Sequence, residues 1–121
     1  RLITGPEILA GSTRLKAGTA TKMALNIIST SVMIKLGKVY DNRMIDLSVT
    51  NEKLIDRAIG ILFDIGSVDK QTALQLLKKT NGSVKLSLLI ALSGLDVIEA
   101  KKLLDDSQGN LRTALIKVKI D

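Results

Sequence analysis

The sequence predicts a mainly α-helical fold, and three observations support this. Apolar residues make up 45% of the 121 residues but aromatic residues only 2%. The core must therefore consist of Leu, Ile, Val, Ala and Met, which suits helices packed on helices. No proline interrupts residues 13–36. The last third of the chain repeats one pattern of helix signals, with a shift of 27 residues.

The first segment, residues 1–40, is expected to be the end of a larger domain. Residues 2–3 suit the tail of a strand. Ser12 follows a glycine and is a natural N-cap, so a helix is predicted to begin near it. The helix should continue to Leu36, and Gly37 is a plausible residue to end it.

The second half of this helix is apolar around most of its circumference. Its apolar residues are Met23, Leu25, Ile27, Ile28, Val32, Met33, Ile34 and Leu36. A helix of this kind is normally buried on all sides, and a chain of 121 residues offers few elements to bury it. We expect its cover to be either the rest of its domain or a second subunit.

The second segment, residues 41–66, is expected to be a linker followed by a connecting helix. A polar turn at residues 41–42 leads into a short alternating stretch at residues 44–49. Thr50-Asn51 then caps a helix that runs to about Ile65. Its predicted buried stripe comprises Leu54, Ala58, Ile61, Leu62 and Ile65. Glu52 and Asp56 are one turn apart, and we interpret them as part of a solvated face and not as a catalytic pair.

The third segment, residues 67–121, contains the repeat and is predicted to form a helical bundle. The aligned pairs include Asp69 with Asp96, Ala73 with Ala100, Leu76-Leu77 with Leu103-Leu104, Gly82 with Gly109 and Leu88-Leu89 with Leu115-Ile116. Each copy reads as an Asp N-cap, a helix, a C-terminal Gly and a second helix capped by Ser83 or Asn110. One apolar stripe cannot be buried alone, so the copies must pack together.

Composition excludes several classes of chemistry. The chain has no Cys and no His, which rules out disulfides, thiolate metal sites and Ser-His-Asp catalysis. The absence of Cys also fits a cytoplasmic protein. The most apolar run lies between Lys22 and Lys35, shorter than the roughly 20 residues that span a bilayer. No membrane partner is expected.

The net charge of +6 invites a comparison with nucleic-acid-binding proteins. Residues 1–50 contribute +4 and the remainder +2. This excess is spread out, without a basic run or interleaved aromatic residues for base stacking. Nucleic acid is therefore not expected as a partner.

The segment at residues 5–22 carries the strongest chemical signal. Glycines and small hydroxyl residues lead into the predicted helix, with Arg14 and Lys16 in its first turn. Cations are unfavourable at a helix N-terminus, and a bound anion would explain them. The hydroxyls of Ser12 and Thr13 and the backbone N–H groups would then converge on it. The alternative is a tight helix entry whose small residues only allow close packing.

The same segment resembles the signature of the family of N-acetylmuramic acid 6-phosphate etherases and the animal glucokinase regulatory protein. The matching positions are Gly-Pro-Glu at 5–7, Gly-Ser-Thr-Arg at 11–14, Lys16 and Lys22. Further similar segments are residues 26–30, 36–40, 50–54, 81–85 and 93–96, so the resemblance covers essentially the whole chain.

The resemblance implies a sugar isomerase-type α/β domain whose closing helix begins near Ser12. It implies a lyase that cleaves the D-lactyl ether of N-acetylmuramic acid 6-phosphate, a phosphorylated amino sugar, during peptidoglycan recycling. The reaction uses two glutamates of that domain as acid and base, without metal or nucleotide. Neither glutamate lies in this chain. We therefore expect no catalytic residue here, and a chain that is inactive by itself.

The resemblance also assigns site residues. Ser12, Thr13, Arg14 and Lys16 match the signature and are expected to bind substrate, with Lys16 reaching it most directly. The resemblance also implies a homodimer, so Lys16 is expected to reach either its own pocket or that of a neighbour. Glu7 is expected to orient Arg14 or Lys16 without touching the substrate.

Residues 67–121 resemble the three-helix modules of the ubiquitin-associated type. The similar spacings are Ala-x-x-Leu-Leu at 100–104 and Gly-Asn-Leu-x-x-Ala-Leu at 109–115. The Met-Gly-Phe/Tyr loop that grips ubiquitin is missing, so we expect a structural cap or dimer element and no ubiquitin partner. Two alternatives to the lyase remain: a phosphosugar-sensing regulator of the glucokinase regulatory type, and a simple helical interaction module.

Overall fold

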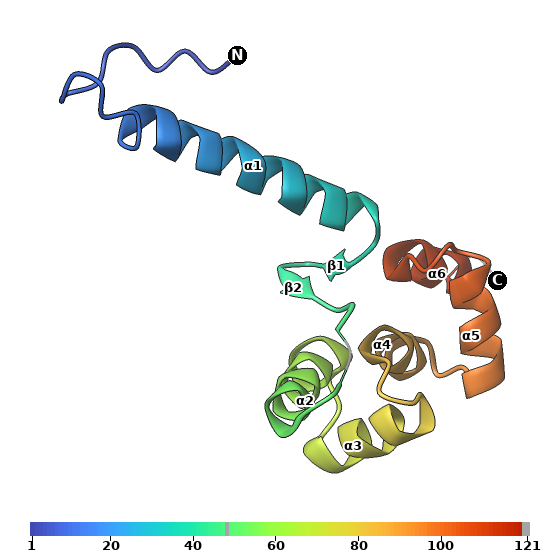
Figure 1. The fold of residues 1–121 in the computed structure, drawn as a ribbon. Coiled ribbons are helices and arrows are strands. Elements are labelled where there is room, and N and C mark those ends of the chain that lie inside the picture. Colours follow the sequence, from blue (N-terminus) through green and yellow to red (C-terminus); the bar gives the residue numbers. More distant parts are fainter. Residues whose placement is uncertain (48, 120–121) are drawn as a thin grey trace. The chain divides into compact units, whose positions relative to one another are not determined.

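The computed structural model describes residues 1–47 and 49–119, and it confirms the mainly α-helical fold. This part of the chain contains six helices and one two-stranded hairpin (Figure 1). The chain divides into two compact units, Arg1–Lys35 and Leu36–Asp121. Within the described ranges, no helix combines the length and apolarity that a bilayer span requires.

The first unit consists of an irregular N-terminal segment and helix α1, Lys16–Lys35. The predicted start near Ser12 is wrong, because residues 12–15 form a turn before the helix begins. The strand expected at residues 2–3 is not seen, as a strand needs a neighbour to share its hydrogen bonds. None of the residues of α1 is buried, and Met23, Leu25, Ile27, Ile28, Val32 and Ile34 are all exposed.

The second unit opens with a short hairpin. Strand β1, Val39–Tyr40, pairs antiparallel with strand β2, Arg43–Met44, and Val39 lies opposite Met44. Asp41 adopts a φ of 50° at the predicted polar turn. The alternating stretch at residues 44–49 runs on beyond the hairpin and places Ile45 in the core at 1% exposure. Ser48 lies outside the described residues.

Helix α2, Glu52–Gly66, agrees with its prediction. Asn51 is the N-cap and its side chain accepts from the backbone N–H of Leu54 at 3.0 Å. On the predicted stripe, Ala58, Ile61 and Leu62 are buried, and Leu54 and Ile65 are half-buried.

The repeat forms two helical hairpins: α3, Lys70–Lys79, with α4, Val84–Ser93, and α5, Val97–Asp105, with α6, Leu111–Val118. All four predicted N-caps are confirmed, each side chain accepting from the N–H group three residues later: Asp69, Ser83, Asp96 and Asn110. Gly82 and Gly109 have φ of 79° and 70°. Each follows a second left-handed residue, Asn81 or Gln108, which the sequence did not predict.

Helix α4 is the centre of the bundle. It contacts α2, α3, α5 and α6, and Figure 1 shows it surrounded by these helices. Half of its ten residues are buried: Val84, Leu86, Ser87, Leu88 and Leu89. The core therefore lies around the second helix of the first repeat copy, and the second copy packs against it.

Candidate functional site

The predicted site lies on the turn before α1, in the first unit. Gly5 and Gly11 have φ of 70° and 80°, values that favour glycine. The backbone N–H of Ser12 donates to the carbonyl oxygen of Leu9 at 3.0 Å, and that of Thr13 donates to the carbonyl oxygen of Gly11 at 3.1 Å. These bonds fold the chain tightly just ahead of the helix.

Glu7 occupies the N-terminal end of α1. Its Oε2 atom accepts from the backbone N–H of Lys16 at 2.9 Å, and its Oε1 atom accepts from that of Ala17 at 3.0 Å. Ser12 therefore does not cap the helix, because the first unpaired N–H groups belong to Lys16 and Ala17. A carboxylate satisfies both groups at once and interacts favourably with the helix dipole.

These bonds change the acidity of Glu7. The hydrogen bond from Ala17, then that from Lys16, lowers the pKa of the carboxyl below its ordinary value of 4.5. Slight desolvation opposes the shift, and the positive charge of Lys16 adds to it. The negative charge that the sequence predicted at this helix end is therefore supplied by the chain itself.

Lys16 is the best-placed cation of the predicted set. Its Nζ atom donates to the carbonyl oxygen of Pro6 at 3.0 Å, so the side chain folds back over the turn. An ammonium group has three donors, and this bond uses one of them. Arg14 and Thr13 are exposed and Ser12 is half-buried. The main-chain oxygens of Ser12 and Thr13 accept from Leu15 and Gly18 at 3.2 and 2.8 Å.

A surface groove of about 570 Å³ runs beside the first turns of α1. Its lining is mainly apolar and comprises Thr4, Leu15, Lys16, Thr19, Ala20 and Met23. Lys16 thus borders a groove that also presents two threonine side chains. Thr4 and Thr19 were not predicted, because neither stands out in a segment rich in small hydroxyl residues.

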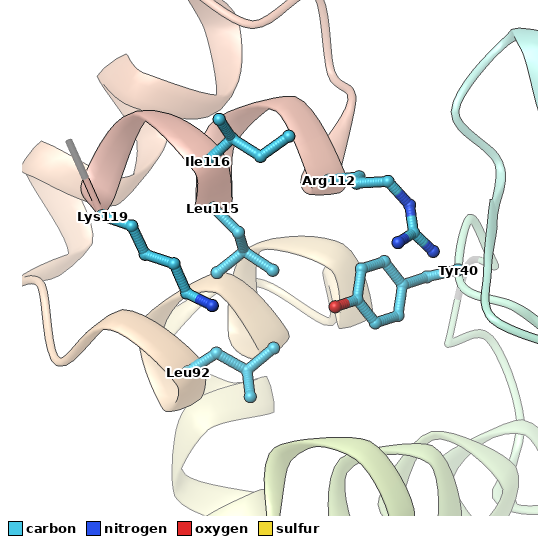
Figure 2. Close-up of a pocket in the computed structure, with 6 residues that line it drawn as sticks. All are labelled: Tyr40, Leu92, Arg112, Leu115, Ile116 and Lys119. Carbon is cyan, nitrogen blue, oxygen red and sulfur yellow. The ribbon is translucent and has the colours of Figure 1, made fainter.

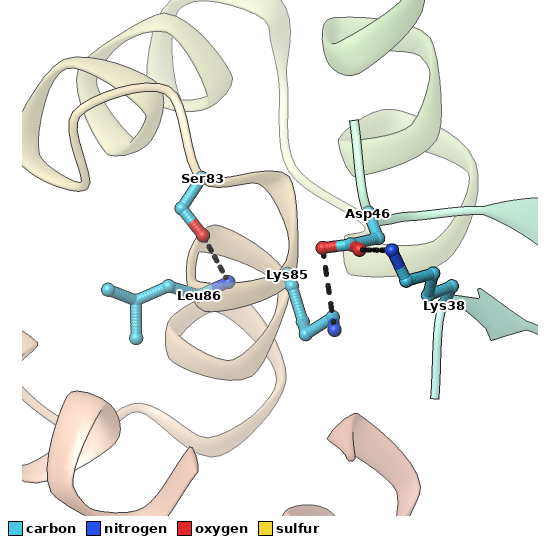
Figure 3. Close-up of polar contacts among 5 residues, drawn as sticks. All are labelled: Lys38, Asp46, Ser83, Lys85 and Leu86. Atoms are coloured by element: carbon cyan, nitrogen blue, oxygen red, sulfur yellow. Dashed lines mark hydrogen bonds and ion pairs between the residues drawn. The ribbon is translucent and has the colours of Figure 1, made fainter. Parts of the chain in front are cut away.

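A second polar cluster lies in the other unit and is shown in Figure 3. Asp46 bridges Lys38 at 3.1 Å and Lys85 at 3.6 Å, and the Lys85 side chain is only 12% exposed. Burial raises the pKa of Asp46, but its bonds with the two lysines outweigh burial and lower it. A polar cavity of about 620 Å³ beside the cluster is lined by Lys38, Asp46, Leu47, Val49, Thr50, Asn81, Gly82 and Ser83. Within the described ranges, acidic side chains do not gather into a set that could hold a metal ion.

Comparison with known proteins shows which proteins this chain resembles most strongly among the two kinds named by the motif. Over 119 residues, the chain is 88% identical to an N-acetylmuramic acid 6-phosphate etherase of Prochlorococcus marinus (strain NATL1A). The resemblance to the etherases is confirmed. The etherase of strain NATL2A is 90% identical over the same length, and that of Parasynechococcus marenigrum (strain WH8102) is 60% identical over 114 residues.

These matches cover almost all of this chain but only part of each etherase. They cover 98%, 98% and 94% of this chain, but only 38%, 38% and 36% of the three etherases. The chain therefore spans little more than a third of the length of these relatives. In addition, residues 41–82 match the family described as the C-terminal lid domain of glucokinase regulatory protein. That stretch contains β2, α2 and α3 of the etherase-like chain.

Proposed function

We propose that the protein containing this chain is an N-acetylmuramic acid 6-phosphate etherase. It would cleave the D-lactyl ether of its substrate to give N-acetylglucosamine 6-phosphate and D-lactate in cell-wall recycling, in the cytoplasm. The observation that carries the proposal is 88% identity to a named etherase over 98% of the chain. The acid and base are expected in the part of the protein that this chain lacks.

The turn before α1 is proposed to contribute to substrate binding. The substrate bears a phosphate and a carboxylate, and the Lys16 ammonium has donors to spare beyond its bond to Pro6. Arg14 adds a second exposed cation two residues before Lys16. Ser12 and Thr13 carry hydroxyl groups in the same turn.

Glu7 is proposed to position Lys16 without touching the substrate. Its carboxylate fixes the backbone of Lys16 through a bond of 2.9 Å. The carboxylate offsets the partial positive charge at the N-terminal end of α1. The ammonium group of Lys16 is then not needed there and can direct its remaining donors toward a ligand. Loss of Glu7 should therefore act through Lys16.

The domain arrangement of the whole protein is also a proposal. Residues 1–40 would close a sugar isomerase-type α/β domain, and residues 41–66 would connect it to the bundle at residues 67–121, which resembles ubiquitin-associated modules. The exposed apolar residues of α1 support this, because the rest of the larger domain would bury them. A homodimer is proposed on the same ground. The match to a lid domain concerns residues 41–82 and does not by itself favour a regulatory function.

A lactate assay tests the proposed reaction. The full-length protein should release D-lactate from N-acetylmuramic acid 6-phosphate, and the 121-residue chain should release none. A full-length protein that binds the sugar phosphate without releasing lactate would instead be a regulator. Lactate release by the chain alone would refute the location of the acid and base.

The role of Lys16 needs a matched variant. Lys16→Ala in the full-length protein should reduce kcat/KM for the etherase reaction by about 10-fold to 100-fold, as for loss of a charged hydrogen bond. Lys35→Ala removes the same charge from the last turn of the same helix and should leave kcat/KM nearly unchanged. Equal effects of the two changes would remove Lys16 from the site.

A further inference from the structure

A pocket in the second unit lies outside everything assigned so far (Figure 2). It measures about 340 Å³ and is lined by Tyr40, Leu92, Arg112, Leu115, Ile116 and Lys119. Arg112, Leu115 and Lys119 are spaced at helical intervals that put them on one face at α6. The pocket therefore combines an apolar wall with two cations.

The polar groups of the pocket are arranged around a common space. Figure 2 shows the Lys119 ammonium and the Tyr40 hydroxyl pointing toward one another, with Leu115 on one side of them and Leu92 on the other. Both groups are hydrogen-bond donors. A ligand atom between them would have to be an acceptor, and a negatively charged acceptor would interact best with Lys119.

Arg112 holds one side of this space in place. Its guanidinium lies 5.0 Å from the centroid of the Tyr40 ring, and its Nη2 atom donates to Oδ1 of Asp41 at 3.2 Å. The stacking fixes the position of the Tyr40 ring. The bond to Asp41 leaves further guanidinium donors unused. Arg112 thus keeps hydrogen-bond donors available beside the pocket while it is paired with Asp41.

We propose that this pocket binds a small amphiphilic carboxylate. The carboxylate would lie between Lys119 and Tyr40, and the apolar body would contact Leu92, Leu115 and Ile116. A volume of about 340 Å³ is at the small end of the range for small-molecule sites, roughly 300–1,000 Å³, so the apolar body must be short. The site is separate from the proposed etherase chemistry and does not depend on it.

The chain carries its own probe for this pocket. Tyr40 is the only tyrosine and the sequence has no tryptophan, so tyrosine emission reports on this place alone. Titration of the 121-residue chain with sodium octanoate should change the Tyr40 emission in a saturable way. Octanamide, which is nearly the same size but uncharged, should bind about tenfold more weakly because it cannot form the charged hydrogen bond.

Two lysine variants complete the test. Lys119→Gln should weaken octanoate binding by about tenfold. Lys117→Gln is the matched control, since its Nζ atom donates to the carbonyl oxygen of Asp106 at 2.9 Å and does not line the pocket. An emission that does not saturate, equal binding of octanoate and octanamide, or equal effects of the two variants would each overturn the proposal.

Discussion

The hydroxyl oxygens of Thr80 and Ser87 lie 2.8 Å apart inside the helical bundle. Both residues are buried, at 7% and 0% exposure. Thr80 also contacts the carbonyl oxygens of Leu76 and Ser83 at 3.0 and 3.2 Å. This pair joins the end of α3 to the middle of α4 through polar groups that water cannot reach.

The second copy of the repeat lacks this bond. The equivalent positions, 27 residues later, are Ser107 and Ala114. Ser107 is 5% exposed, and its Oγ atom has no hydrogen-bond partner among the described residues. The second copy therefore keeps one hydroxyl, on Ser107, but has alanine at the position of its hydrogen-bond partner. A buried hydroxyl without a partner destabilises the folded state.

The two copies should therefore respond in opposite ways to loss of the hydroxyl. Ser107→Ala should leave the free energy of unfolding unchanged or raise it by up to about 1 kcal/mol, because an unpaired polar group disappears. Thr80→Val should lower it by about 1–3 kcal/mol, because Ser87 is left unpaired. Urea denaturation followed by circular dichroism measures both. Similar losses in the two variants would contradict the difference between the copies.

Low pH should loosen the start of α1. The pKa of Glu7 is lowered in the folded chain, so its contribution to stability is complete above the ordinary value of 4.5 and is lost as the pH falls through the lower folded value. The protection factors of the Lys16 and Ala17 amides, which compare hydrogen exchange with that of an unfolded chain at the same pH, should fall in this range when measured by nuclear magnetic resonance. In Glu7→Gln the same two amides should exchange faster at neutral pH and lose this pH dependence. Unchanged exchange in the variant would show that Glu7 does not cap the helix.

Asp46 should matter more for stability than an exposed acidic residue. Asp46→Asn deprives the largely buried Lys85 of its counter-ion, and we expect a loss of about 1–2 kcal/mol. Asp64→Asn breaks only the exposed pair with Arg43 and should cost under about 1 kcal/mol. Chemical denaturation of both variants at neutral pH makes the comparison.

The loss of stability caused by Asp46→Asn should depend on pH. The pKa of Asp46 is lowered, so its contribution is present above its ordinary value of 3.8 and fades as the pH falls through the lower folded value. The difference in stability between wild type and Asp46→Asn should therefore shrink in this range. A constant difference across the range would indicate that the charge of Asp46 is not responsible.

The isolated chain should self-associate through α1. Seven large apolar residues of this helix are at least 37% exposed: Met23, Leu25, Ile27, Ile28, Val32, Met33 and Ile34. Ile27→Lys should shift the chain toward monomer in sedimentation velocity, because it places a charge within this apolar surface. Ile98→Lys changes an even more exposed isoleucine on α5 and should leave association unchanged. A wild-type chain that is already monomeric would refute the expectation.

Local signals in the sequence were sufficient for the helices of the second unit. Asn51, Asp69, Ser83, Asp96 and Asn110 all cap as predicted, because a cap depends on neighbours only a few residues away. The start of α1 was misplaced because its cap, Glu7, is nine residues before the amide that it accepts from. No local pattern marks such a contact.

The pocket at Tyr40 shows the same limit at longer range. Arg112 bonds to Asp41 across 71 positions, so only the packing of the bundle brings these residues together. The 27-residue shift of the repeat aligns Arg112 with Lys85. This alignment does not predict that Arg112 contacts the hairpin. The unpaired hydroxyl of Ser107 likewise becomes apparent only when alignment of the copies is combined with burial.

The central position of α4 determines how the bundle can open. Because this helix contacts α2, α3, α5 and α6, neither repeat copy can detach without exposing its apolar side chains to water. The two copies share one core, as the repeat pattern predicted, and should melt in one cooperative step. The amide hydrogens of Leu88 and Leu89 should therefore exchange only through global unfolding.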